Sequence, residues 1–166
     1  DPVFGTEQER AQQAIDEFQK VAAKYGEPYR SEARYFIATN LLVTDRARGI
    51  GELQSLAQTS GETAVLAKFA LAQTKETDHS YDEAAALYGE IARLNAAIVT
   101  PESANLRLAS VYSKQGKKKE AADLLFNMID TARKAKDKDG KPQPESSASR
   151  EAGQLLKKID PARWGQ

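Results

Sequence analysis

The chain has 166 residues, of which 40% are hydrophobic, and its 24 basic side chains are balanced by 24 acidic ones. Such a balance gives no support for binding to nucleic acid or to an anionic membrane surface. The chain has no cysteine, which excludes disulfides, thiol nucleophiles and thiolate metal sites. Its length suits one domain or one short array of repeats.

The first predicted helix follows Thr6 and ends before Gly26 and Pro28. Thr6 and Glu9 have the spacing of a capping box. Its apolar residues then recur at helical spacing, namely Ala11, Ala14, Ile15, Phe18, Val21 and Ala22. Because the chain starts at Asp1 without a methionine, we expect a processed or trimmed product whose targeting segment lies outside the sequence.

Apolar periodicity predicts three further helices in the middle of the chain, over residues 28–43, from Asp45 to the break at Ser60 and Gly61, and over 63–77. Asp45 is positioned to cap the second of them. Gly49 and Gly51 lie inside this same helix, and each costs about 1 kcal/mol relative to alanine. We therefore expect this helix to be the least regular. The next helix is predicted to start at a capping box formed by Ser80 and Glu83.

The most complete helical hairpin begins at Thr100, which is suited to cap a helix whose first residue is Pro101. Gly116 is predicted to end that helix in a left-handed conformation. A second amphipathic helix follows the lysines at 117–119. Ala109 and Ala121 are small residues, and we expect them where the two helix axes approach most closely.

The same hairpin pattern occurs twice upstream. The segments YFIA, FALA and LRLA align at residues 35–38, 69–72 and 106–109, so that successive copies are 34 and 37 residues apart. A second alignment joins DEAA at 82–85 to KEAA at 119–122. A helix–turn–helix unit that repeats near 34 residues resembles the tetratricopeptide repeat (TPR) superfamily. The first copy departs from the pattern, since Gly49 and Ile50 stand where a glutamate–alanine pair is expected.

The resemblance implies an all-α fold, an α-solenoid of TPR-like antiparallel helix hairpins. It would contain about three repeats, an N-terminal half repeat and a C-terminal capping helix. We divide the chain into a repeat array at 1–135, a flexible charged linker at 136–146, and a capping helix with its tail at 147–166. The linker prediction comes from its charge, its prolines and its lack of apolar residues.

The predicted capping helix covers Ser147 to Ile159 and ends at Asp160–Pro161. Its apolar side carries Ala152, Leu155, Leu156 and Ile159, and its polar side carries Arg150, Gln154, Lys157 and Lys158. A polar outer face is what a terminal repeat needs to stay in solution. Trp164 is expected to pack the tail onto the last repeat, with anchoring to a partner as the alternative.

Repeat geometry places the first helix of each unit on the concave wall of such a solenoid. The residues implied for a partner-binding groove are Tyr35, Thr39, Leu42, Phe69, Gln73, Arg107, Ser110 and Lys114. The aromatic members would act as apolar anchors, and Gln73, Arg107 and Lys114 would hydrogen-bond a peptide backbone or carboxylate. The alternative interpretation is that these are ordinary core and surface residues.

A narrower resemblance comes from AIDEFQKVAAKYG at 14–26 and PYRSEARYFIA at 28–38. These segments are similar to bacterial cell-envelope TPR proteins such as the YfgM-like ancillary subunit of the SecYEG translocon. The resemblance implies a periplasmic accessory factor in protein secretion or envelope assembly, with a membrane anchor upstream of Asp1. A cytoplasmic location is the alternative.

The sequence shows no nucleophile–base pair, glycine-rich phosphate loop or metal-ligand cluster. The single histidine, His79, is interpreted as an ordinary turn residue. We therefore predict a non-catalytic scaffold that binds a peptide or protein, without cofactor or metal. The alternative function is self-association, in which the unpaired N-terminal helix forms a homodimer.

Overall fold

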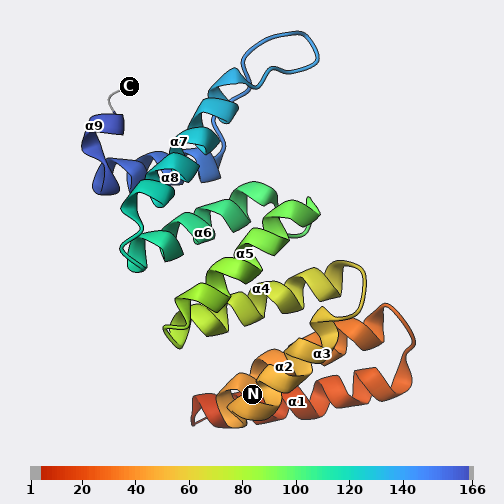
Figure 1. Ribbon diagram of the computed structural model, residues 1–166. Helices are drawn as coiled ribbons and strands as arrows, with labels where there is room; N and C mark the ends of the chain where they lie inside the picture. The colour runs from red at the N-terminus through yellow and green to blue at the C-terminus, as the bar shows by residue number, and fades with distance from the viewer. Residues whose placement is uncertain (1–4, 165–166) are drawn as a thin grey trace. The chain divides into compact units, whose positions relative to one another are not determined.

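A computed structural model of the chain describes residues 5–164, and every helix or strand assigned in that range is an α-helix (Figure 1). The all-α prediction is therefore confirmed. Residues 1–4 and 165–166, which belong to the predicted array and tail, lie outside the described residues. None of the helices within 5–164 combines the length and apolar character that crossing a bilayer requires.

The chain divides into two compact units at the peptide bond between Leu71 and Ala72. This boundary falls inside α4 (Glu62–Thr77). The first unit contains α1 (Glu7–Lys24), α2 (Tyr29–Thr44), α3 (Arg46–Ala57) and the start of α4. Within it, α2 packs against both α1 and α3.

The N-terminal helix α1 begins as predicted. The Thr6 hydroxyl accepts a hydrogen bond from the Glu9 backbone, and the Glu9 carboxylate accepts one from the Thr6 backbone. Ala11 and Ile15 are buried, and α1 packs on α2. Because α1 packs on α2, part of its apolar side is covered within the chain; that it is a half repeat without its own first helix stays a prediction.

The helix α3 is continuous over twelve residues despite its two glycines, so the expected irregularity is absent. The packing around Gly49 explains why this position needs a glycine. A Cβ atom on Gly49 would lie 2.7 Å from the Leu42 backbone nitrogen and 2.9 Å from the Ala38 carbonyl oxygen. The missing side chain therefore lets the backbones of α2 and α3 approach each other closely. Asp45 caps α3 as predicted, accepting from the Arg48 backbone N–H.

The second unit contains the end of α4, then α5 (Tyr81–Leu94), α6 (Pro101–Lys114), α7 (Lys118–Lys134), α8 (Ser147–Ile159) and α9 (Pro161–Trp164). Within it, α6 packs against α5, α7 and α8. The short helix α9 packs on α7 and α8. From α5 to α9, each helix thus packs on the helix that follows it in sequence (Figure 1).

The hairpin of α6 and α7 has the predicted caps. Thr100 accepts a hydrogen bond from the Ser103 backbone, and Pro101 occupies the first helical position. Gly116 has a φ of +76°, which only glycine adopts without strain. Ala109 and Ala121 are fully buried, as expected for residues at a close helix contact.

The predicted capping box at Ser80 is wrong, because its side chain makes no cap hydrogen bond. A capping box requires the Ser80 backbone N–H to donate to the Glu83 carboxylate. This N–H instead donates to the Lys75 carbonyl oxygen at 2.8 Å. The Glu83 carboxylate in turn forms an ion pair with the Lys75 ammonium. The turn between α4 and α5 thus already occupies the backbone N–H that the capping box needs.

The capping helix α8 has the predicted bounds and an exposed polar face. The structure adds the short helix α9, whose start is capped by the Asp160 carboxylate. The indole of Trp164 lies directly over Gly153 of α8, so it packs on the capping helix, whereas the prediction named the last repeat. Arg163 forms an ion pair with Asp123 of α7, so the tail is fastened to two helices.

The segment at 136–146 contains a tight turn. The Asp137 carboxylate accepts backbone hydrogen bonds from Asp139 at 2.9 Å and from Lys141 at 2.8 Å. Lys136 and Pro142 form an isolated antiparallel bridge. The flexibility of this segment stays a prediction.

Replacing Gly49 with alanine should lower the free energy of unfolding by about 1–3 kcal/mol, because the new methyl group meets the backbone of α2. The matched control is Gly51→Ala in the same helix, where the added Cβ meets nothing within 4 Å. This control should raise stability by up to about 1 kcal/mol. Urea denaturation followed by circular dichroism measures both, and equal effects at the two glycines would contradict the proposed contact.

Candidate functional site

Three of the predicted groove residues, Tyr35, Thr39 and Leu42, lie on α2 and are half-buried. The ring of Tyr35 meets that of Phe36 edge-on at 5.5 Å, and burial raises the pKa of the Tyr35 hydroxyl. The hydroxyl of Thr39 donates to the Phe36 carbonyl within the helix at 3.0 Å. Phe69, on α4, is also half-buried.

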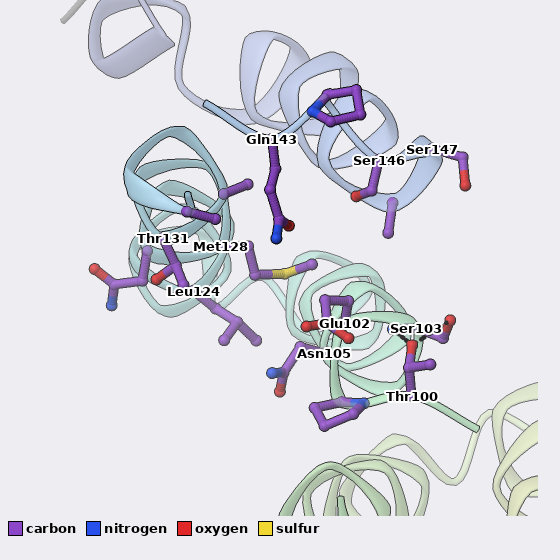
Figure 2. Close-up of a pocket in the computed structure, with 16 residues that line it drawn as sticks. Thr100, Glu102, Ser103, Asn105, Leu124, Met128, Thr131, Gln143, Ser146 and Ser147 are labelled. Atoms are coloured by element: carbon purple, nitrogen blue, oxygen red, sulfur yellow. Dashed lines mark hydrogen bonds between the residues drawn. The ribbon is translucent and has the colours of Figure 1, made fainter. Parts of the chain in front are cut away.

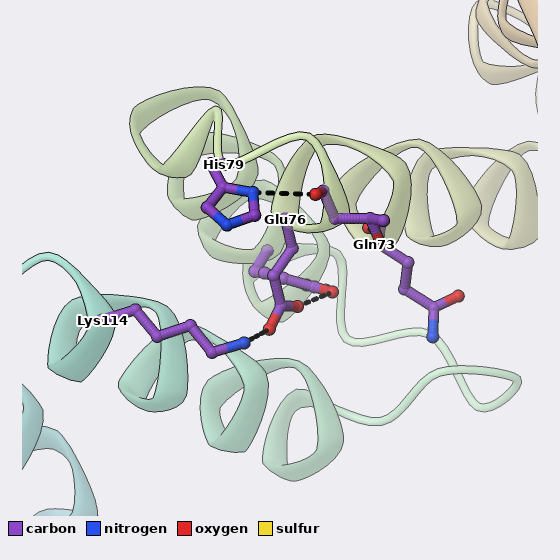
Figure 3. A network of polar contacts seen from close by, with 6 residues as sticks. Gln73, Glu76, His79 and Lys114 are labelled. Atoms are coloured by element: carbon purple, nitrogen blue, oxygen red, sulfur yellow. Dashed lines mark hydrogen bonds and ion pairs between the residues drawn. The ribbon is translucent and has the colours of Figure 1, made fainter.

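The other predicted residues lie in the second unit, where α4 contributes Gln73 and α6 contributes Arg107, Ser110 and Lys114. Gln73 and Ser110 are half-buried, whereas Arg107 and Lys114 are exposed. Gln73 lies one turn before Glu76 and points away from its carboxylate (Figure 3). That all eight residues form one groove stays a prediction.

The structure shows one polar network around Glu76 that joins three helices of the second unit (Figure 3). The Lys114 ammonium of α6 donates to one carboxylate oxygen at 2.6 Å. The hydroxyl of Tyr88, from α5, donates to the other at 3.0 Å. Tyr88 is fully buried, and the side chain of Glu76 is 9% exposed. Both carboxylate oxygens therefore have a partner in a largely dry environment.

Burial of Glu76 by itself would raise its pKa, because removal from water disfavours the charged form. The hydrogen bonds from Lys114 and Tyr88 outweigh that effect, and the pKa of Glu76 is lowered. The pKa of Tyr88 is raised, first by burial and then by the neighbouring carboxylate. The charge of Arg107 also lowers the pKa of Glu76, so Arg107 and Lys114 act on the same carboxylate.

This network connects α4 to α5 and α6 through two hydrogen bonds to one carboxylate. Glu76 accepts from two donors, and Tyr88 keeps its proton, so neither group is suited to exchange protons near neutral pH. Lys114 is half-exposed, but its charge is compensated by Glu76. Its capacity to attract a peptide carboxylate is correspondingly reduced.

His79 lies in the turn between α4 and α5, as predicted, with a φ of +61°. It is exposed. Its Nδ1 lies 3.0 Å from the Thr77 carbonyl oxygen, a contact made two residues away in sequence (Figure 3). The ring thus completes a local turn.

The first unit exposes large apolar side chains along one helix. Tyr29, Phe36 and Val43 of α2 are 58%, 44% and 37% exposed and are spaced seven residues apart. We call these three residues the α2 stripe. On α1, Phe18 stacks on Phe36 with ring centroids 4.8 Å apart. Tyr25, at the end of α1, meets Tyr29 edge-on at 6.1 Å.

Sequence reasoning placed Tyr35, Thr39 and Leu42 on the concave wall but did not recognise the heptad spacing of the α2 stripe, which begins at Tyr29. That spacing was a usable signal, because residues seven apart lie on one helix face. It also missed the Glu76 network. No local pattern predicts that Tyr88, a residue of an apolar stripe, reaches a carboxylate twelve residues away.

Comparison of the chain with protein-family models, curated proteins and solved structures gives no match. The site therefore has to be interpreted from its own geometry.

Replacing Glu76 with glutamine should lower the free energy of unfolding by about 1–3 kcal/mol at neutral pH, because two hydrogen bonds to a charged acceptor are weakened. The lowered pKa sets the pH dependence. The difference in the free energy of unfolding between wild type and variant should reach its full size above about pH 5, since a glutamate in the unfolded chain titrates near 4.3. It should disappear as the pH falls through the lower pKa of the folded protein.

The control for this experiment is Asp130→Asn. Asp130 pairs with Lys134 at the same 2.6 Å separation, but both side chains are considerably exposed. An exposed pair contributes about 0–1 kcal/mol, so this variant should behave almost as wild type. Urea titrations at several pH values measure both, and a Glu76→Gln effect that persists unchanged at pH 2 would contradict the ionic explanation.

Proposed function

We propose that the chain is a non-catalytic scaffold of TPR-like repeats that binds another protein, and that the α2 stripe is the binding surface of its first unit. Two features support the TPR-like arrangement. Sequential helices pack on each other in both units. The small residues Ala72, Ala84, Ala109 and Ala121, which occupy the characteristic positions of the repeat pattern, are all fully buried.

The observation that carries the binding proposal is the exposure of Tyr29 and Phe36. Large apolar side chains clustered on a surface are typical of protein–protein contacts, and exposed tyrosines offer an apolar ring with a polar end. Stacking of Phe18 on Phe36 extends the apolar surface onto α1.

The spacing of the stripe favours one kind of partner. Side chains at i, i+7 and i+14 form a nearly straight row along a helix, which suits contact with a second helix lying alongside it. We therefore propose that the partner presents the apolar face of an amphipathic helix. The half-buried Tyr35, Thr39 and Leu42 follow a parallel row of α2 and would flank such a helix.

The narrower resemblance to cell-envelope TPR proteins extends this proposal. On that basis the partner is a protein in secretion or envelope assembly, and the scaffold acts on the periplasmic side of a bacterial membrane. The cytoplasmic alternative is separated from this by cell fractionation of the natural gene product.

Self-association is the second candidate function. The homodimer would form through the N-terminal helix α1, and the exposed aromatic rings of Tyr25 and Tyr29, at the end of α1 and the start of α2, would extend the contact. The same surface serves both proposals, and one experiment separates them.

A photo-crosslinking residue placed at Phe36 should give adducts in cells, because this side chain faces the proposed partner helix. The matched control is the same residue at Ile98, which is also apolar and 44% exposed but lies in the α5–α6 connection. Phe36 should give one discrete adduct, which the double substitution Tyr29→Ser and Val43→Ser removes, and Ile98 should not give that adduct.

Mass spectrometry of the adduct distinguishes the two candidates. A heterologous protein supports the scaffold proposal, whereas a second copy of this chain supports self-association. Absence of any discrete adduct at Phe36, or identical adducts at Phe36 and Ile98, would contradict both.

A further inference from the structure

A cavity of about 640 Å³ lies within the second unit, between the start of α6, the C-terminal half of α7 and the segment that leads into α8 (Figure 2). Its volume is in the range of sites that hold a small ligand or part of a peptide. The predicted groove residues of α6, which are Arg107, Ser110 and Lys114, do not line it. The cavity is therefore distinct from the surface proposed above.

The floor of the cavity is apolar. Leu124 and Met128 of α7 line it and are only half-buried within the chain. The methionine side chain is flexible and polarisable, so it can adapt to apolar groups of different shape. This floor suits one aliphatic side chain of a ligand.

The walls carry uncharged amide groups. Asn105 of α6 and Asn127 of α7 line the cavity, and neither side-chain amide has a hydrogen-bond partner within residues 5–164. Gln143 extends from the preceding segment into the cavity, toward Met128 (Figure 2). Its Nε2 donates to the Lys136 carbonyl at 3.3 Å, and its Oε1 stays available as an acceptor. Each amide offers a donor and an acceptor, as a peptide bond does.

The charges around the cavity disfavour ions of either sign. Among residues 5–164, Glu102 is the one charged side chain that lines it, and it opposes an anionic ligand. The starts of α6 and α8 also border it, where Thr100 and Ser146 cap their helices. The positive ends of these two helices oppose a cation. A neutral ligand is repelled neither by Glu102 nor by the two helix starts.

We infer that this cavity binds a short, uncharged, extended peptide segment that places one aliphatic side chain on Leu124 and Met128. The side-chain amides of Asn105 and Asn127 pair with its backbone N–H and C=O groups, and Gln143 closes over it. The site is independent of the α2 stripe, which belongs to the other unit.

The test uses the full chain labelled with ¹⁵N and the blocked peptide acetyl-Ser-Leu-Ser-amide as the probe. Titration should shift the backbone amides at 100–105, 124–132 and 143–148, together with the side-chain amides of Asn105 and Asn127. Versions of the probe with aspartate or lysine in place of leucine should bind at least about tenfold more weakly.

The double variant Asn105→Ala, Asn127→Ala should weaken binding by about tenfold or more, since tenfold corresponds to one lost hydrogen bond of about 1.4 kcal/mol. Gln154→Ala, on the exposed face of α8, is the matched control and should bind as wild type. Arg107→Ala should also leave binding unchanged, which separates the cavity from the predicted groove.

Three results would overturn the inference. They are no shifts at millimolar probe, shifts centred outside the named segments, and unchanged affinity in the double variant while circular dichroism shows it to be folded. The two proposals can fail separately. If Phe36 gives no crosslink but the probe shifts the amides of the cavity segments, the α2 stripe is rejected and the cavity site is retained.

Discussion

Close approach between the backbones of neighbouring helices is the constraint on which the packing depends. Half of the buried apolar residues between 5 and 164 are alanines, and at Gly49 even one methyl group would collide with α2. Small side chains bury little apolar surface each, so stability has to come from many short contacts along each helix pair. The packing of each unit is accordingly dominated by helices that follow one another in sequence.

The same constraint explains where the large side chains lie. Where small residues fill the contacts between helices, aromatic rings are accommodated mostly at the edges. Tyr29 and Phe36 are exposed on α2, and Trp164 lies over a glycine at the end of the chain. Within the part of the chain that the structure describes, Tyr88 is the aromatic residue that is fully buried, and its hydroxyl donates to the Glu76 carboxylate. A surface rich in aromatic rings is therefore a product of the packing as well as the basis of the proposed function.

Local chemistry made much of the fold predictable. The caps at Thr6, Asp45 and Thr100 and the bounds of α8 follow from signals within a few residues, because a helix end satisfies its free N–H groups locally. The predicted capping box at Ser80 does not form, because the Ser80 backbone N–H donates to the Lys75 carbonyl oxygen instead. By contrast, the need for a glycine at position 49 and the hydrogen bond between Tyr88 and Glu76 depend on how two helices pack against each other. Periodicity placed Tyr35 and Lys114 on a helix face, but it contains no information on which groups of another helix they contact.

The most direct test of this account is native-state hydrogen exchange measured across a series of low denaturant concentrations. If packing is mainly between sequential helices, the amides of α1–α3 and those of α6–α8 should join two separate cooperative groups with different opening free energies. Convergence of all slowly exchanging amides on one opening free energy and one denaturant dependence would contradict it, because the chain would then share a single cooperative core.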